Sequence, residues 1–342
     1  MGFINSKSMN KYIIIDLSLV LFSCDSLLFE KDQASTNPRD NFDYLWEQCD
    51  EKYSFFDLKN IDWDSVKAVN SVRITDDMSD DSLFQVLGDM LISLRDDHTN
   101  LISDFNISYF GVKNLGQDNF DWRVVTDNYL PEHYYISGPF QHDFLKNTNN
   151  EIGYIRFSAF TGTVNDDNLN FILNRYSGTK GLILDLRENG GGAVTDVFQL
   201  LSRFIETETI VYYSKIKTGK AHDDFSEELP ANVEPSTEVR YKNKVCVLID
   251  RGTFSAGSFT SLATKAIPNL VLVGDTTGGG LGLPNGGQLP NGWTYRFSVS
   301  QTLDLNKENK YENGVPPDVY SLFDWSDMTT DEVIEQAKIE LK

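Results

Sequence analysis

The sequence has little of the material from which disulfide frameworks and metal sites are built. Only three cysteines and four histidines occur in 342 residues. The cysteines are Cys24, Cys49 and Cys246, the last two within apolar patterns. The histidines, which show no spacing typical of metal ligands, are His98, His133, His142 and His222. We therefore expect no disulfide framework, no metal site and no bound cofactor.

Basic residues are scarce as well. Lys and Arg number 30 against 51 Asp and Glu, which gives a formal net charge of −21, and no basic block occurs. Binding to nucleic acid needs clustered Lys and Arg, so that function class is excluded, and an acidic surface also resists anionic lipid. With 40% apolar and 24% charged residues, the chain has the composition of a globular protein with a sizeable core.

The first residues have the pattern of a secretion signal. Two lysines precede the apolar segment 12–22, which is too short for a permanent membrane span but suits a signal-peptide core, although Asp16 interrupts it. The segment ends in Leu21-Phe22-Ser23-Cys24, which resembles the lipobox of bacterial lipoproteins. The resemblance implies a lipoprotein signal peptide over 1–23, a lipid-anchored Cys24, a tether over 24–39 and a cell-envelope location. A plain signal peptide with a coincidental cysteine is the alternative.

Helical spacing then predicts a small N-terminal helical domain over 40–105. Its first helix begins at Asn37-Pro38, its second near Asp62, and its third is capped around Ser79 and ends at Arg95. His98 follows the third helix, so we place it on a loop, where a helix C-terminus favours a protonated imidazole. Residues 106–150 are expected to be connecting strands and loops.

From residue 151 the pattern changes to strands alternating with helices. Continuous apolar strands are expected at 152–157, 181–186, 245–249 and 270–274, with helices between them, which indicates an α/β fold whose sheet is covered on both faces. We assign 151–322 to this core, with a hairpin turned at Pro290-Asn291-Gly292 and a surface insertion over 218–243. A helix over 323–342, capped at Thr329 with Glu332 three residues later, closes the chain.

Ser255 lies where an apolar strand turns into a helix. At such a corner its hydroxyl projects beside the free N–H groups of the first helical turn, which is a geometry suited to a nucleophile. An ordinary N-cap serine is the alternative. The run Gly190-Gly191-Gly192 ends an earlier strand and exposes backbone N–H groups. No Gly-Lys-Ser/Thr accompanies it, so an oxyanion site is favoured over a phosphate loop.

Four ordered motifs together resemble a known family. They are Asp185-Leu-Arg-Glu-Asn-Gly-Gly-Gly192, Ser255-Ala256, Val273-Gly-Asp-Thr-Thr-Gly-Gly279 and Glu312-Asn-Gly-Val-Pro-Pro-Asp318. They are similar to the core of the C-terminal processing and tricorn-type serine peptidases, the tail-specific protease superfamily. Residues 42–101 resemble the helical part of envelope members. The resemblance implies a Clp-protease/crotonase-like α/β core and peptide hydrolysis through an acyl-serine.

The resemblance also implies the site residues. The Ser-Lys branch carries its lysine in a Thr-x-Gly-Lys-Gly loop, but here Gly280 occupies that place. The tricorn-like branch uses a histidine from the preceding domain and a late carboxylate, and His98 and Glu312 fall at the matching motifs. Ser255 is then the nucleophile, His98 the base, and Glu312 orients the imidazole directly or through Thr99. The implied oxyanion donors are the N–H groups of Gly191 and Ala256.

Other functions on the same fold stay open at this point. The implied partner is a peptide or protein substrate, and membrane contact is expected through the lipid anchor only. A catalytically inactive ligand- or peptide-binding protein is the main alternative, and an acyl-CoA enzyme of the crotonase type is the second. The joint presence of Ser255, His98 and Glu312 argues against the former. The secretion signal argues against the latter. No PDZ module is recognisable between 101 and 150, and the oligomeric state stays open.

Overall fold

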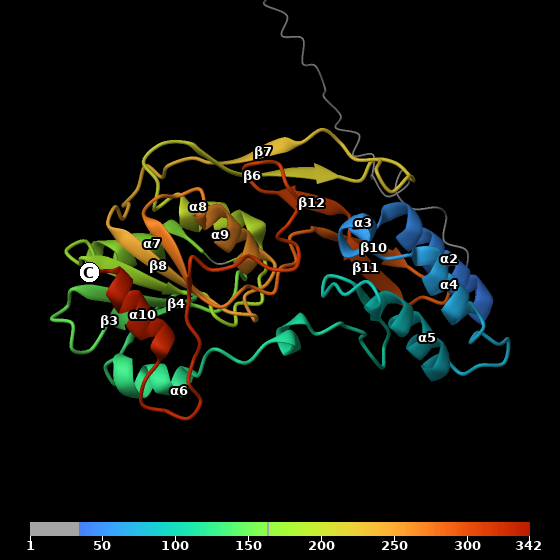
Figure 1. The fold of residues 1–342 in the computed structure, drawn as a ribbon, viewed down its shortest axis with the longest axis horizontal. Coiled ribbons are helices and arrows are strands. Elements are labelled where there is room, and N and C mark those ends of the chain that lie inside the picture. Colours follow the sequence, from blue (N-terminus) through green and yellow to red (C-terminus); the bar gives the residue numbers. More distant parts are fainter. Residues whose placement is uncertain (1–33, 163) are drawn as a thin grey trace, which may run out of the picture. The chain divides into compact units, whose positions relative to one another are not determined.

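The structure, a computed structural model, describes residues 34–162 and 164–342 (Figure 1). Cys24, the expected signal peptide and most of the expected tether lie outside the described residues. Within the described part, no helix combines the length and the apolar character needed to cross a membrane.

Four helices form the region that follows residue 34. They are α2 (Pro38–Lys52), α3 (Phe56–Lys59), α4 (Trp63–Ser71) and α5 (Asp80–Ile92). Asn37, Asp62 and Ser79 cap α2, α4 and α5, because each side chain accepts a hydrogen bond from the first turn. The three predicted helix starts are confirmed. The last helix ends at Ile92 rather than at Arg95, since Ser93 and Leu94 form a turn that the bond from the Arg95 N–H to the Ile92 carbonyl closes.

The helices pack against a hairpin that comes from far along the sequence. Strand β1 (Asn100–Ile102) pairs with β11 (Thr294–Ser298), which pairs with β10 (Pro284–Gln288), all antiparallel. Tyr295 and Phe297 of β11 share one apolar core with the buried faces of α2 and α5. In Figure 1 the blue and teal helices accordingly lie beside the orange-red hairpin. The predicted turn at residues 290–292 is confirmed.

A seven-stranded sheet forms the centre of the α/β part. Its order is β13-β9-β8-β5-β4-β3-β2, parallel from β13 to β4 and antiparallel at β3 and β2. The strands are β2 (Tyr135–Ser137), β3 (Phe140–Phe144), β4 (Ile152–Phe157), β5 (Gly181–Asp185), β8 (Lys244–Ile249), β9 (Leu270–Gly274) and β13 (Val319–Tyr320). The predicted apolar strands are therefore confirmed to within a residue.

Alternate residues of each central strand enter different cores. Leu182 and Leu184 of β5 pack with α7 (Asp166–Arg175), α8 (Val194–Leu201) and α9 (Ala256–Thr264). Ile183, between them, packs with α10 (Glu332–Glu340) and the segment of α6 (Trp122–Val124) and η2 (Val125–Tyr129). Because neighbouring side chains of a strand point to opposite faces, both faces of the sheet are covered, as predicted.

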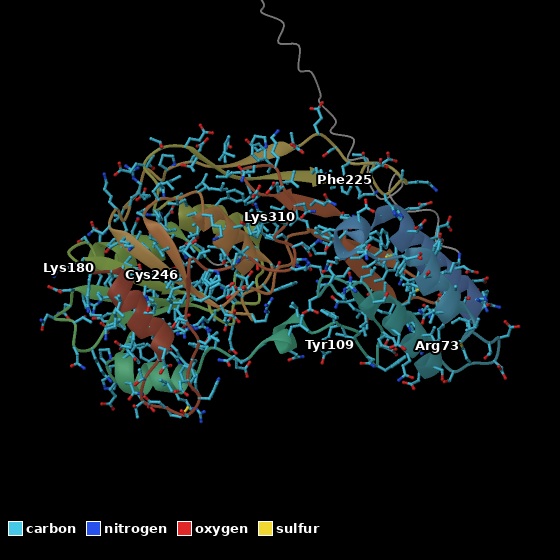
Figure 2. The ribbon with its side chains drawn as sticks, in the orientation of Figure 1. Arg73, Tyr109, Lys180, Phe225, Cys246 and Lys310 are labelled. Carbon is cyan, nitrogen blue, oxygen red and sulfur yellow. The ribbon has the colours of Figure 1, made fainter. Side chains whose placement is uncertain are left out.

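The expected insertion contains a strand of its own. β7 (Leu229–Val233) pairs with β6 (Thr209–Ile216), which also pairs with β12 (Ser300–Leu303). The connection between β6 and β7, with Phe225 labelled in Figure 2, reaches α2 through the pairs Lys220–Glu51 at 2.5 Å and His222–Asp50 at 3.0 Å. The insertion is thus attached at its tip.

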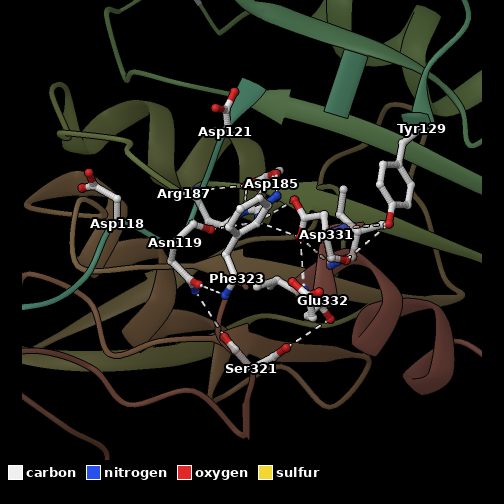
Figure 3. A network of polar contacts seen from close by, with 12 residues as sticks. Asp118, Asn119, Asp121, Tyr129, Asp185, Arg187, Ser321, Phe323, Asp331 and Glu332 are labelled. Atoms are coloured by element: carbon white, nitrogen blue, oxygen red, sulfur yellow. Dashed lines mark hydrogen bonds and ion pairs between the residues drawn. The ribbon is translucent and has the colours of Figure 1, made fainter. Parts of the chain in front are cut away.

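The closing helix has a different cap from the expected one. Asp331, not Thr329, accepts from the N–H groups of Val333 and Ile334, at 3.1 and 3.0 Å. Its carboxylate also lies 3.0 Å from the guanidinium of Arg187, which is fully buried and pairs with Asp185 at 2.6 Å (Figure 3). The prediction of Thr329 was wrong because Asp331 both caps the helix N-terminus and pairs with the buried Arg187. The pairing with Arg187 joins positions far apart in the chain and is not visible in the local sequence.

Candidate active site

Ser255 occupies a strained corner between β8 and α9. Its backbone has φ 53° and ψ −120°, a combination that non-glycine residues rarely adopt and that costs about 1–3 kcal/mol. The strain is held by the Ser255 N–H, which donates to the carbonyl of Gly279 at 3.0 Å, and by its carbonyl, which accepts from Phe259 at 2.8 Å. The side chain makes no capping hydrogen bond to α9. The hydroxyl is therefore not an ordinary N-cap.

His98 reaches Ser255 from the loop between α5 and β1. Its Nε2 lies 2.9 Å from the Ser255 hydroxyl, within hydrogen-bonding distance, and its ring centroid lies 4.8 Å from that of Phe254. The backbone N–H of His98 donates to one carboxylate oxygen of Asp96 at 2.8 Å, and the other oxygen of Asp96 accepts from the Ser298 hydroxyl at 2.8 Å. Residues 157 positions apart are thus brought together by a supported loop.

The surroundings of His98 favour a neutral imidazole. Burial lowers its pKa, Asp96 raises it, and Arg296 lowers it further, so that the pKa lies below its usual value. A neutral ring whose Nε2 accepts from Ser255 carries its proton on Nδ1. Among the described residues, that nitrogen has no hydrogen-bond partner of normal geometry. The carbonyl of Gly282 is close enough to raise the pKa of His98.

Glu312 is brought near the site but does not contact the imidazole. One oxygen accepts from the N–H of Leu281 at 2.7 Å, and the other lies 3.8 Å from the ammonium of Lys59. In the part of the chain that the structure describes, Glu312 makes no hydrogen bond to His98 or to Thr99, and the Thr99 hydroxyl has no partner. Burial, and secondly Asp96, raise the pKa of Glu312 to about 8 against the opposing effect of Lys59.

The predicted oxyanion donors lie beside the serine. Gly191 has φ 95°, and a side-chain carbon there would lie 2.6 Å from the Cβ of Ser255 and 2.9 Å from the N of Ala256. Only glycine allows so close an approach. Ala256 is the first residue of α9, whose N-terminus supplies unpaired N–H groups. In this structure the Gly191 N–H donates to the side-chain oxygen of Asn189 at 3.0 Å.

The loop after β9 leaves no room for a lysine at position 280. Gly280 has φ 71°, and a side-chain carbon there would collide with the ring of Phe254. A cavity of about 210 Å³, lined by Phe254, Gly278 and Gly280 among others, opens between the helical region and this loop. Its apolar lining includes Phe110, Val112 and Leu115. Its charged lining includes Lys59 and Glu312.

Three residues of the site were missed in the sequence. Asp96 and Ser298 support the His98 loop, and Lys59 is a lysine with a side chain only 3% exposed. Asp96 could have been found from its place two residues before His98. The sequence signal for Lys59 was weaker. Lys59 lies four positions after Phe55, a spacing that places both side chains on one face of a helix. Ser298 gave none, because it depends on the pairing of β11 with β1.

The other histidines lie in different settings. His142 of β3 is held between Ser137 at 2.9 Å and the hydroxyl of Tyr176 at 2.7 Å, and burial lowers its pKa to about 4. His222 pairs with Asp50 and stacks on Phe56. His133 is exposed. Ser137 thus also meets a histidine, but it lies in the edge strand β2, without a strained backbone or a following helix.

The fold and the site define a class of protein. It is a mixed α/β protein with a serine at a strand–helix corner and a histidine supplied by the preceding helical region. The family model described as peptidase family S41 matches residues 151–321, and that of the Tricorn protease C1 domain matches residues 34–92. The chain belongs to peptidase family S41, whose members are serine-type hydrolases.

Solved structures and curated relatives agree with this assignment. The crystal structure of a candidate peptidase from Parabacteroides merdae is 36% identical, with a TM-score of 0.85 over 90% of this chain and 97% of that one. Mature CPAF complexed with lactacystin is 13% identical, with a TM-score of 0.68 over 90% and 97%, and shares the fold. The carboxy-terminal processing protease CtpA of Bacillus subtilis is 26% identical over 182 residues, 53% of this chain. That match spans only 37% of CtpA.

Proposed function

We propose that this chain is a serine endopeptidase that hydrolyses peptide bonds through an acyl-serine intermediate. One observation carries the proposal: the hydroxyl of Ser255, at a strained strand–helix corner, lies 2.9 Å from Nε2 of His98. A nucleophile needs an adjacent base within hydrogen-bond reach, and this pair meets that requirement. Membership of peptidase family S41 supports it.

The reaction follows from the positions of the two side chains. His98 Nε2 takes the Ser255 proton as Oγ bonds to the carbonyl carbon, which gives a tetrahedral oxyanion and an imidazolium. The imidazolium then protonates the leaving amine as the carbon–nitrogen bond breaks. Water, deprotonated by the same nitrogen, then adds to the acyl carbon, and the carbon–Oγ bond breaks as the imidazolium returns the proton to Ser255. The pKa of His98, lowered mainly by burial, keeps the ring in the base form.

Backbone donors beside Ser255 would stabilise the oxyanion. The Ala256 N–H lies at the N-terminus of α9, where the helix dipole favours negative charge. The Gly191 N–H is the second donor in this proposal, and it would exchange its bond to Asn189 for one to the oxyanion. Loss of one such donor typically costs about 3 kcal/mol in the transition state.

In this proposal Glu312 acts on His98 indirectly, through the backbone of residues 281 and 282. Its carboxylate holds the N–H of Leu281, next to Gly282, whose carbonyl faces the imidazole closely enough to raise the pKa of His98. The carbonyl of Gly282 would accept a hydrogen bond from Nδ1–H of His98 during the reaction. Because the pKa of Glu312 is about 8, its side chain would add a negative charge that stabilises the imidazolium only where it ionises, towards the upper end of the pH range.

We also propose that the protein is a lipoprotein of the bacterial cell envelope. The proposal depends on Leu21-Phe22-Ser23-Cys24 and the apolar segment before it. Mass spectrometry of the mature protein should find a diacylglyceryl group on an N-terminal Cys24. A mature form that begins downstream of Cys24 without lipid would contradict the anchor and leave the peptidase proposal untouched.

A fluorophosphonate probe tests the nucleophile directly. It should label the wild type at Ser255, and Ser255→Ala should lose both labelling and cleavage of a peptide library while it keeps the wild-type melting temperature. Ser137→Ala is the matched control, because Ser137 also lies 2.9 Å from a histidine nitrogen, that of His142. It should be labelled like the wild type. Labelling at Ser137, or peptide binding without cleavage, would contradict the proposal.

A further inference from the structure

Lys59 is a buried ammonium at the base of the candidate site. It is the last residue of α3, which the left-handed Asn60 ends at φ 49°. Its side chain is 3% exposed, and its ammonium donates to the carbonyl of Arg95 at 2.8 Å. The guanidinium of Arg95 donates back to the carbonyl of Lys59. The short helix and the start of the His98 loop are therefore joined in both directions.

The same ammonium faces the loop after β9. Glu312, whose side chain is 1% exposed, places one oxygen 3.8 Å from Lys59 and the other on the N–H of Leu281. Its backbone carbonyl accepts from Gly280 at 3.0 Å. Glu312 thus holds the 280–281 backbone at two points, and Lys59 holds Glu312.

Lys59 also balances two buried carboxylates. Burial raises the pKa of Asp96, but Lys59 more than compensates together with His98 and the hydrogen bonds to Asp96, so that the pKa lies below its usual value. For Glu312, Asp96 raises and Lys59 lowers the pKa. Without the ammonium, Asp96 and Glu312 would repel each other in a site with little water to screen them.

The contacts of Lys59 show that it is not the base. Its ammonium donates to the Arg95 carbonyl at 2.8 Å and lies 3.8 Å from the Glu312 carboxylate, whereas the Ser255 hydroxyl has His98 as its partner. Its place between two loops suits the positioning of other groups.

We propose that Lys59 is the positioning residue that fixes the Asp96–His98 loop against the Leu281–Gly282 loop through Glu312, and so holds the His98 ring opposite Ser255. The inference rests on the proposed peptidase function. It assigns to the helical region a second contribution beyond His98, a charge that joins the two halves of the site.

The test compares Lys59→Met with Lys59→Arg, Glu312→Gln and the double variant. Lys217→Met is the matched control, because Lys217 is also buried and its ammonium also donates to a carbonyl, that of Ala221. Lys217 lies outside the site, where its ammonium is near the aromatic ring of Phe225. Peptide kcat, KM and the pH dependence of kcat/KM are measured, with fluorophosphonate labelling and melting temperature.

Lys59→Met should lower kcat by about tenfold or more with little change in KM, because a small misplacement of His98 relative to Ser255 is costly. The acid limb of kcat/KM should move to lower pH, because Asp96 and Glu312, which share the cluster with Tyr53, Arg95, Asp97 and His98, then ionise less readily and Asp96 raises the pKa of His98 less. Lys59→Arg should restore most of kcat, and Lys217→Met should behave like the wild type. The Lys59→Met and Glu312→Gln effects should be only partly additive: kcat of the double variant should lie below that of Glu312→Gln, because the bond from Lys59 to the Arg95 carbonyl is also lost, but above the product of the two single losses.

A Lys59→Met variant with wild-type kcat and pH profile, while Ser255 still reacts with the probe, would overturn the inference and leave the peptidase proposal intact. If wild-type Ser255 fails to react, the peptidase proposal fails first. Should Lys59→Met not fold, the double variant, which has one buried carboxylate fewer, decides. A kcat of the double variant below that of Glu312→Gln supports the role of Lys59 in holding the Asp96–His98 loop, and equal kcat values and labelling rates for these two variants contradict it.

Discussion

His98 sits among groups whose effects on its pKa oppose each other. Burial lowers the pKa most, Asp96 raises it, and the net pKa lies below the usual value. Because the base must be neutral, kcat/KM should fall as pH drops through this lowered pKa, so we expect the acid limb below about 6.5. A pH series of kcat/KM checks it. The Asp96→Asn variant should move the limb to lower pH, since it removes the charge that raises the pKa. A limb unchanged in that variant would contradict the assignment.

Glu312 predicts a dependence of stability on pH. Its folded pKa of about 8 lies above its unfolded value, so the folded protein binds one more proton between about pH 4.3 and pH 8. The contribution to stability is complete below that window and is lost as pH rises through it, by about 1.4 kcal/mol per pH unit.

Urea unfolding of Glu312→Gln measures this effect. The variant should lack this decrease between pH 5 and 8, whereas Glu335→Gln, which removes a half-exposed carboxylate paired with Lys338, should keep it. Equal pH dependences for the wild type and Glu312→Gln would show that the carboxyl titrates normally.

Single residues of the site were predictable where the chemistry is local. Ser255 and His98 each follow an element whose end is visible in the sequence, and the structure places them 2.9 Å apart. Lys59 gave only a weak signal, because a lysine ordinarily lies at the surface and the Arg95 carbonyl and Glu312, which make its burial tolerable, come from other parts of the chain. The hydrogen bond from the Leu281 N–H to Glu312 was also missed, because it joins two loops that are separate in the sequence.

At the scale of elements, the glycine turn after β5 shapes the nucleophile corner. Gly191→Ala would press a methyl group against Ser255 Cβ at 2.6 Å and require a non-glycine residue at φ 95°. We expect the rate of fluorophosphonate labelling to fall by at least tenfold, because the serine or the oxyanion donors must shift. Gly190→Ala is the control, since a carbon there meets no atom within 4 Å. Equal labelling rates for the two variants would contradict the close approach.

The closing helix α10 depends on Asp331. Asp331→Ala removes the helix cap and leaves Arg187, fully buried, with Asp185 as its remaining carboxylate partner among the described residues. A broken buried pair costs about 3–5 kcal/mol, so the free energy of unfolding in urea should fall by that order. Thr329→Ala should change it by less than about 0.5 kcal/mol, because the exposed Thr329 bonds only to Asp327. A comparable loss in Thr329→Ala would restore the cap predicted from the sequence.

Element boundaries were predictable because apolar runs and caps are local signals. The strand expected at 152–157 is β4 as found, and Ser79 caps α5 as expected. Which elements pack or pair with one another was harder to predict from the sequence. In the chain, the hairpin of β10 and β11 lies between strands β9 and β13 of the central sheet, yet it packs on α2 and α5. Strand pairing between β1 and β11, about 195 residues apart, leaves no pattern in a single sequence.

At the scale of the whole molecule, the site is assembled from two regions that are separate in the sequence. His98, Asp96 and Lys59 come from the helical part, whereas Ser255 and Glu312 follow strands of the α/β part. Contacts such as His98 to Ser255 at 2.9 Å and Lys59 to Glu312 at 3.8 Å join these regions. A serine and a histidine so far apart in sequence are therefore competent only in the folded chain.

The net charge of the whole molecule leads to the last prediction. A formal charge of −21 creates a negative potential that attracts cationic peptides and repels anionic ones before either contacts the site. The Debye length falls from about 30 Å at 0.01 M salt to about 8 Å at 0.15 M, so added salt screens this attraction. For three peptides with one cleavage sequence and flanking Lys, Ser or Glu residues, kcat/KM should fall with salt for the Lys peptide, rise for the Glu peptide and change little for the Ser peptide. The Ser peptide is the control for direct effects of salt on Ser255 and His98. Parallel salt curves for all three would show that the charge lies too far from the substrate path to steer association.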